Sequence, residues 1–342
     1  MLFSQIIGHE DIKKKLIQSV KENRIAHAQL FLGPEGTGKL ALAIAYAQYV
    51  NCTNKGENDS CGECPSCKKF NNLAHPDLHF IFPSTTNKNV KKDPESDFFL
   101  TEWREYLESC ECYANISSWH NALDAENKQG IINVRDASTI IRKLNLKTYE
   151  SEYKVAIIWM AERLNIEAAN KLLKLLEEPP ENVIFILATT EEHKILPTIL
   201  SRCIRFEFKK IGKAGIVKRL EHVLKDYDVR YDIEALEHIA ELADGGMRDA
   251  LSILERCITS GEGEITEQKI EEIIGTVPKK LIHDIVISVL EYNITKVEEL
   301  VNTILSSGKD LRNISASITQ EFLKVLNDCL TILDNQNISY VV

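Results

Sequence analysis

Residues 33–39 read Gly33-Pro34-Glu35-Gly36-Thr37-Gly38-Lys39, and this Gly-x-x-x-x-Gly-Lys pattern decides the fold. A loop of this kind surrounds phosphate with backbone N–H groups, and its lysine reaches the outer phosphates. A Ser or Thr normally follows the lysine and binds Mg²⁺ through its hydroxyl, whereas this chain has Leu40. The sequence therefore predicts a phosphate-binding loop that lacks its usual metal ligand.

The flanks of the loop predict a strand before it and a helix after it. The apolar run Gln29–Leu32 ends directly at Gly33, and the alanine-rich stretch that starts near Lys39 favours a helix. Backbone N–H groups at the start of that helix then point to the phosphate. Because glycine-rich turns also serve as plain tight connections, this position in the chain is what supports phosphate binding.

Further apolar runs predict a parallel sheet. Runs that are rich in Val, Ile and Phe and separated by helical patterns are typical of strands buried on both faces. The five expected strands are Gln29–Leu32, Leu78–Phe82, Val155–Met160, Val183–Ala188 and Ile204–Phe208. A helix is expected over Asn165–Leu176, because Pro179 and Pro180 stop it. The fold class is therefore α/β.

Strand-like runs disappear after about Lys210, where helical periodicity takes over. Pro278 marks a second boundary within the helical part. We therefore expect three domains, over residues 1–209, 210–277 and 278–342. The third domain is short for a complete helical domain, so one interpretation is that the chain is truncated.

A polar segment over residues 84–128 interrupts the first domain. It carries mixed charges, with Lys91 and Lys92 beside Asp93 and Glu95. Charge runs usually face water, so we expect a solvated and irregular insert, with a DNA-contacting loop as the alternative.

The overall composition excludes several classes of protein. A formal net charge of −10 argues against coating of nucleic acid through overall charge, because binding a polyanion needs a surplus of Lys and Arg. The longest apolar runs fall far short of the roughly 20 residues of a membrane helix, and the first residues lack the apolar core of a signal peptide. We expect a soluble, cytoplasmic protein without a membrane partner.

Four of the nine cysteines are spaced Cys-x₈-Cys-x₂-Cys-x₂-Cys, in a module over residues 52–67. They are Cys52, Cys61, Cys64 and Cys67. Four thiolates at this spacing can close a tetrahedron around Zn²⁺, and such a site is structural because no position stays open for substrate. In a cytoplasmic chain we expect structural zinc before disulfides, with reduced free thiols as the alternative.

The strand Val155–Ile158 stands where a working ATPase carries an Asp for Mg²⁺ and a Glu that polarises water. The residues that follow it are Trp159 and Met160, which can do neither. Glu162 lies two positions beyond Met160, and we expect it to leave the strand end in another direction.

The motifs together resemble the bacterial clamp-loader ATPase family of DNA polymerase III. After the loop and the cysteines come Leu172-Leu173-Lys174-Leu175-Leu176-Glu177-Glu178-Pro179-Pro180, Ala188-Thr189-Thr190 and Leu196-Pro197-Thr198-Ile199-Leu200-Ser201-Arg202-Cys203. The resemblance extends to about Leu251. It implies an AAA+ fold, with a Rossmann-like P-loop domain and its zinc-binding insert, a helical lid over 210–277, and an all-α collar over 278–342 that joins a ring of subunits.

Loss of the metal ligands is similar to what separates the delta-prime subunit of this family from its gamma/tau motors. The resemblance therefore implies a delta-prime-like stator that is no enzyme by itself. Its partners would be the gamma/tau and delta subunits, and through the complex the sliding clamp and the primed DNA onto which the clamp is loaded.

The resemblance also assigns site residues. Arg202 would act in trans, as an arginine finger at the ATP site of a neighbouring subunit, with a local salt bridge as the alternative. ATP or ADP would bind without hydrolysis through Gly33, Gly36, Thr37, Gly38, Lys39, Thr190 and Arg248. The alternative for Arg248 is that it lies in a lid helix and pairs with an acidic neighbour.

Two other functions stay open. A gamma/tau-like ATPase motor predicts Mg²⁺-dependent turnover, which Leu40, Trp159 and Met160 make hard to supply. A zinc-dependent DNA-binding protein predicts salt-sensitive DNA binding by the isolated chain, lost when Cys61 or Cys64 is disrupted. The acidic balance of the chain argues against this last function.

Overall fold

The computed structural model describes most of the chain and divides it into two compact units. The described residues are 1–125, 128–225, 227, 229–260, 263–275, 279–306, 315, 318–319 and 321–327. One unit consists of Met1–Lys225 with Ala240–Ser252, and the other of Asp226–Ile239 with Ile253–Val342. The predicted boundary at Pro278 and the residues after 327 lie outside the described residues.

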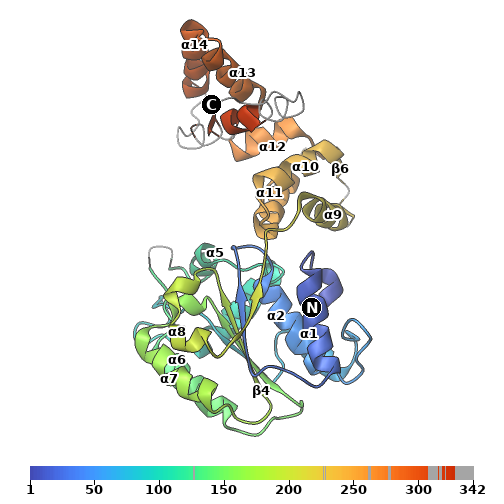
Figure 1. Cartoon of the computed structure of the whole chain (residues 1–342), viewed down its shortest axis with the longest axis vertical. Helices are drawn as coiled ribbons and strands as arrows, with labels where there is room; N and C mark the ends of the chain where they lie inside the picture. Colours follow the sequence, from blue (N-terminus) through green and yellow to red (C-terminus); the bar gives the residue numbers. More distant parts are fainter. Residues whose placement is uncertain are drawn as a thin grey trace, which may run out of the picture. The chain divides into compact units, whose positions relative to one another are not determined.

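A five-stranded sheet forms the centre of the first unit (Figure 1). Its strands are β1 (Ala28–Leu32), β2 (Leu78–Ile81), β3 (Lys154–Trp159), β4 (Val183–Thr189) and β5 (Ile204–Glu207). They are ordered β2-β3-β4-β1-β5, and each neighbouring pair is parallel. The predicted strands and their parallel pairing are confirmed.

Burial differs between the middle and the edge of this sheet. Every residue of β3 and β4 is buried, because each of these strands has a neighbour on both sides and helices over both faces. Among the strands that the structure describes, β5 pairs only with β1, and its Ile204 is 54% exposed. The expectation of burial on both faces is therefore wrong for this edge strand.

Helices cover both faces of the sheet, and the sheet separates the hydrophobic core into two clusters. The helices of this unit are α1 (Glu10–Lys21), α2 (Lys39–Val50), α3 (Pro65–Asn71), α4 (Leu100–Ser109), α5 (Ile116–Ala122), α6 (Val134–Leu144), α7 (Ile166–Glu177), α8 (Pro197–Leu200) and α9 (Lys213–Leu224). Short 3₁₀ helices lie at Phe3–Gln5, Ser96–Phe99, Ala161–Arg163 and Glu192–Lys194. Figure 1 shows α1 and α2 on one side of the sheet and α6 and α7 on the other.

The alternation of side chains along β1 explains the two clusters. Phe31 packs in the cluster that contains α2 and α4, whereas Leu30 packs in the cluster that contains α6 and α7. α2 directly follows the phosphate loop, and from Leu40 to Val50 each of its residues is buried. The loop is thus anchored at both ends in the core, which fixes its position.

The insert over residues 84–128 is mostly folded, which corrects the expectation of an irregular, solvated segment. It contributes α4 and α5, whose Trp103 and Trp119 are fully buried with ring centroids 4.9 Å apart. The ring of Trp103 also stacks on Phe82 at 4.3 Å. The prediction gave weight to the charged run before residue 98 and overlooked the apolar side chains at helical spacing after it.

The second unit is helical. Helices α10 (Ile233–Leu242) and α11 (Met247–Thr259) each have residues in the ranges of both units. Helices α12 (Glu267–Ile274), α13 (Lys279–Leu290) and α14 (Ile294–Ser306) follow in the range of the second unit. Strands β6 (Arg230–Tyr231) and β7 (Glu264–Ile265) pair in parallel. Ile282 and Ile285 of α13 pack against Ile304 of α14. Across the described ranges, each helix falls short of the length and apolar character that a membrane span requires.

Candidate functional site

The phosphate loop connects the end of β1 to the start of α2, as the sequence predicts. Gly33 lies against the strand-end backbone of Phe208, and a Cβ at Gly33 would stand 2.3 Å from the carbonyl oxygen of Phe208. A larger residue would push the loop off the sheet, so the first glycine of the pattern is required by close packing. Gly38 is the N-cap of α2, so the first N–H groups of this helix face the loop.

Lys39 closes the loop on itself. Its Nζ donates hydrogen bonds to the carbonyl oxygens of Gly33 at 2.8 Å and Pro34 at 2.5 Å. Burial lowers the pKa of the Lys39 ammonium to about 8, and the carboxylates of Glu162 and Glu35 oppose part of that shift. This lysine therefore changes its charge close to physiological pH.

Glu162 lies in the site, contrary to the expectation that it leaves the strand end in another direction. Met160 adopts a left-handed backbone conformation with φ of 56°, and a 3₁₀ turn over Ala161–Arg163 follows. This turn brings the carboxylate back beside Thr190, whose Oγ1 donates to Oε1 of Glu162 at 2.8 Å. Oε2 of Glu162 is buried and has no hydrogen-bond partner among the described residues.

A cavity joins these groups. It is lined by loop residues 35–40, by Cys112–Ala114 of the insert, and by Trp159, Met160, Glu162 and residues 188–190 at the strand ends. Its volume is about 30 Å³, which is enough for roughly one water molecule. The cavity thus combines a half-buried cation, a buried carboxylate and the N-terminus of a helix.

Five of the seven predicted nucleotide contacts line this cavity, namely Gly36, Thr37, Gly38, Lys39 and Thr190. Gly33 is connected to the site through its carbonyl oxygen, which accepts a hydrogen bond from Nζ of Lys39. Arg248 is not among the described residues that line the cavity. Its Nη2 donates to Oγ of Ser118 at 2.8 Å, and its Nη1 lies 3.6 Å from Asp249.

Arg202 follows the short helix α8, away from the residues that line the cavity. Its Nη2 donates to Oε1 of Glu177 at 2.7 Å, and its Nη1 donates to the carbonyl oxygen of Thr198 at 2.7 Å. The side chain is 33% exposed. These contacts hold the guanidinium at the surface of the first unit, where solvent reaches it.

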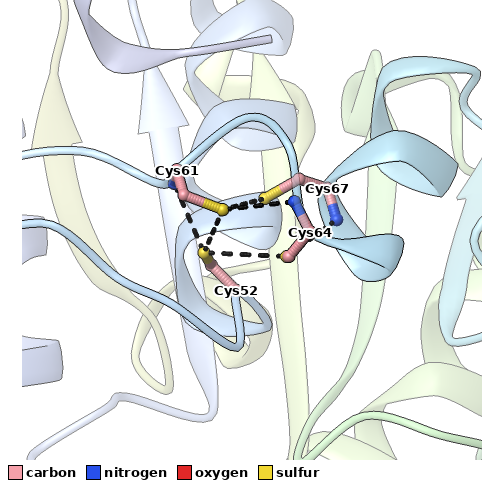
Figure 2. A group of neighbouring side chains, drawn as sticks. All are labelled: Cys52, Cys61, Cys64 and Cys67. Atoms are coloured by element: carbon pink, nitrogen blue, oxygen red, sulfur yellow. Dashed lines mark hydrogen bonds between the residues drawn. The ribbon is translucent and has the colours of Figure 1, made fainter.

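The four clustered cysteines point toward one another (Figure 2). Their sulfur atoms all lie within 4.8 Å of one another. The Sγ atom of Cys52 is 3.5 Å from that of Cys61 and 4.0 Å from that of Cys64, and the Sγ atoms of Cys61 and Cys67 are 3.9 Å apart. Ligands of tetrahedral zinc at a Zn–S distance of about 2.3 Å would be about 3.8 Å apart, so the geometry fits that metal.

Backbone groups support the same four sulfurs. The N–H groups of Cys61, Cys64 and Cys67 point to the sulfurs of Cys52, Cys61 and Cys64, at 3.3–3.4 Å. Such contacts stabilise thiolates and orient them toward a shared metal ion. Cys64 is also the N-cap of α3, so the position of the cluster is fixed by a helix start.

Comparisons with known proteins cover almost the whole chain. Residues 8–212 match the family described as DNA polymerase III, delta subunit, and residues 215–263 match the DNA polymerase III clamp loader subunit, ATPase lid domain. DNA polymerase III subunit tau of Bacillus subtilis is 36% identical over 311 residues, which are 90% of this chain and 47% of that protein. DNA polymerase III subunit gamma of Buchnera aphidicola is 30% identical over 312 residues, covering 91% of this chain and 74% of that protein.

A solved structure shows the same fold at much lower identity. The Thermotoga maritima RuvB Holliday junction branch migration motor has a TM-score of 0.50 and 15% identity, over 94% of this chain and 89% of that chain. This likeness concerns the fold alone. The chain spans less than half of the tau protein that it matches.

The comparisons correct the expectation that the chain is no enzyme by itself. The relatives named above are tau and gamma subunits, and the lid model that matches is an ATPase lid domain. The expectation depended on Leu40, Trp159 and Met160, and it assigned no role to Glu162, which the structure places in the cavity. The expectation was therefore based on a set of site residues that did not include the carboxylate of Glu162.

The family follows from this agreement between motifs, fold and relatives. Both relatives are named as gamma or tau subunits. The comparisons therefore show the clamp-loader family but do not show the delta-prime subunit that the sequence analysis expected. The chain belongs to the clamp-loader family of bacterial DNA polymerase III, with an AAA+ P-loop α/β domain and an ATPase lid domain.

Proposed function

We propose that the chain is a gamma/tau-like subunit of the DNA polymerase III clamp loader that binds and hydrolyses ATP in the phosphate-loop cavity. The observation that carries this proposal is the arrangement of Lys39, Glu162 and Thr190 around one cavity beside the start of α2. Lys39 and the helix N-terminus favour phosphate, and Glu162 offers a carboxylate oxygen without a partner among the described residues.

Glu162 can replace the hydroxyl and the acid that the loop and β3 lack. Mg²⁺ keeps several of its waters and is usually bound through one or two carboxylates together with substrate phosphates. A single buried carboxylate beside the loop is therefore sufficient to bind Mg²⁺ on a nucleotide. Thr190 orients that carboxylate, because its hydroxyl occupies Oε1 and leaves Oε2 for the ion or a water.

The function is tested by ATP hydrolysis of the full chain with Mg²⁺ and primed DNA. The Lys39→Ala variant is the matched control, because it removes the phosphate-binding cation and reveals contaminating activity. We expect turnover by the natural chain that is lost in the variant. Equal rates for the two proteins would refute the proposed activity.

We also propose that Cys52, Cys61, Cys64 and Cys67 hold a structural zinc ion. The separations of their sulfurs and the three N–H···S contacts support a closed four-sulfur site. All four ligand positions belong to the protein, so the metal would stabilise this module and would take no part in hydrolysis.

The helical region after residue 278 is the proposed collar, and residues 210–277 are the proposed lid. Packing of α13 on α14 gives the described part of the collar its own small core. Tyr292 and Ile294, at the turn between these helices, are 90% and 72% exposed. Exposed apolar side chains of this kind suit contact with neighbouring subunits, for which we propose the gamma/tau and delta subunits of a complex that acts on the sliding clamp and primed DNA.

A second candidate is the delta-prime position in the same ring, from which Arg202 would reach the ATP site of a neighbour. It is favoured by the match to the delta subunit model and by the partly exposed guanidinium of Arg202. The test is DNA-stimulated ATP hydrolysis by a reconstituted ring with Arg202→Ala, beside Arg205→Ala as a control on the same surface. A selective loss with Arg202→Ala supports this position, and equal rates for the two variants reject it.

A further inference from the structure

One turn of the insert lies directly over the phosphate loop. Cys112, Tyr113 and Ala114 line the same cavity as loop residues 35–40. A Cβ added to Gly38 would lie 3.2 Å from Cε1 of Tyr113, so the tyrosine ring occupies the space beside the loop that a side chain at this position would need. We call residues 111–114 the cover turn.

The cover turn leaves little space above the loop. The cavity holds about 30 Å³, whereas pockets for nucleotide-sized ligands are typically about 300–1,000 Å³. Tyr113 is 4% exposed and forms part of the cavity wall. A triphosphate needs more room than this, and movement of the Tyr113 ring away from Gly38 would provide it.

Two contacts tie the insert to the helices on the lid side of the first unit. Glu111, at the start of the cover turn, forms an ion pair with Arg219 of α9, whose side chain is 14% exposed. Ser118 of α5 accepts a hydrogen bond of 2.8 Å from Arg248 of α11. Arg248, which the sequence analysis expects to contact phosphate, is thus hydrogen-bonded to the insert in this structure.

The backbone of the cover turn is strained. Glu111 and Cys112 have φ of 48° and 64°, a left-handed conformation that side chains other than glycine adopt at a cost. Hydrogen bonds hold the turn on both sides, from the N–H of Cys112 to the carbonyl of Leu107 at 2.8 Å and between Tyr106 and Asn115 at 2.8 Å. A strained segment that is held by a few contacts can change between two arrangements.

We propose that the cover turn is an autoinhibitory element, which keeps nucleotide out of the phosphate loop until the Glu111–Arg219 and Ser118–Arg248 contacts break. The inference rests on the proposed nucleotide site, whose entry it regulates. Opening moves Tyr113 off Gly38 and releases Arg248 for the phosphates. Any partner that binds Arg219 or the insert would thereby control nucleotide entry.

The test is the association rate of a fluorescent ATP analogue with the full chain in stopped flow. Tyr113→Ala removes the ring, and Glu111→Gln removes the ion pair while keeping the shape of the side chain. We expect both variants to bind at least about tenfold faster, because an open minor state is populated at roughly 10% or less. Tyr149→Ala, which changes a tyrosine that is 79% exposed, is the control and should not alter the rate.

The reactivity of Cys112 gives a second measurement that needs no hydrolysis. Cys112 is 6% exposed, so a thiol reagent should modify it slowly in the natural chain and faster with ATP or in Glu111→Gln, as mapped by mass spectrometry. Faster association in the variants without any turnover supports the cover turn and refutes the ATPase. Lys39-dependent turnover with unchanged association and unchanged Cys112 reactivity overturns the cover turn and leaves the ATPase standing.

Discussion

Glu162 and Thr190 connect the ends of two neighbouring strands through a hydrogen bond of 2.8 Å, in which Oγ1 of Thr190 donates to Oε1 of Glu162. Glu162 follows β3 and Thr190 follows β4, and these strands pair in parallel. The bond holds the carboxylate at the cavity that Lys39 also lines. The proposed Mg²⁺ ligand, Glu162, thus lies three positions beyond Trp159, where a working ATPase carries an acid.

Nucleotide affinity should fall as the pH rises above about 8. Burial lowers the pKa of Lys39 to about 8, so the ammonium is charged below that pH and neutral above it, and a neutral amine loses its attraction for phosphate. Because binding then requires uptake of one proton, the Kd should be constant well below pH 8 and rise by up to about tenfold per pH unit above it. Titration with a fluorescent nucleotide at several pH values measures this.

The matched control for the pH dependence is Lys39→Arg. A guanidinium keeps its charge through this range because the pKa of arginine exceeds 12. The affinity of this variant should not change between pH 7 and pH 9. An equal fall in the two proteins would assign the pH dependence to another group.

Zinc content should follow the four-cysteine cluster. We expect one zinc ion per chain by elemental analysis, and Cys61→Ser should lose it because a tetrahedral site then lacks one thiolate. Cys203→Ser, which changes a cysteine outside the cluster, should keep it. Chelation should lower the melting temperature of the natural chain, since metal binding contributes to folding. Zinc retained by Cys61→Ser would reject the site.

The folded insert should contribute to stability. Trp103 is fully buried and stacks on Phe82, so Trp103→Ala should lower the free energy of unfolding by about 3–5 kcal/mol. Tyr149→Ala, at an exposed position, should change it by less than about 0.5 kcal/mol. Urea unfolding measures both. Equal stabilities would mean that the insert does not pack on the sheet.

Much of the fold could be predicted because its signals are local. The glycine pattern of the loop, the apolar runs of β3 and β4 and the proline stop after α7 each depend on a few neighbouring residues. The spacing of four cysteines likewise predicted that they meet. The parallel direction of the strands was expected from the helical patterns between them.

The features that could not be predicted depend on backbone turns and long-range contacts. The left-handed conformation of Met160 redirects Glu162, and residue types alone do not indicate such a turn. The shared cavity brings together Tyr113 and Gly38, which are 75 residues apart in the chain. The spacing of Phe99, Trp103 and Leu107 on one helical face was the signal that could have identified α4.

The central claim is that Glu162 supplies the carboxylate for hydrolysis, and single-turnover ATP hydrolysis by Glu162→Gln tests it most directly. This change keeps the shape of the side chain and removes its charge, while Glu167→Gln makes the same change at an exposed position of α7. The account predicts that Glu162→Gln hydrolyses bound ATP at least about a hundredfold more slowly, with nucleotide affinity largely kept, and that Glu167→Gln matches the natural chain. Equal rates for all three proteins would contradict it.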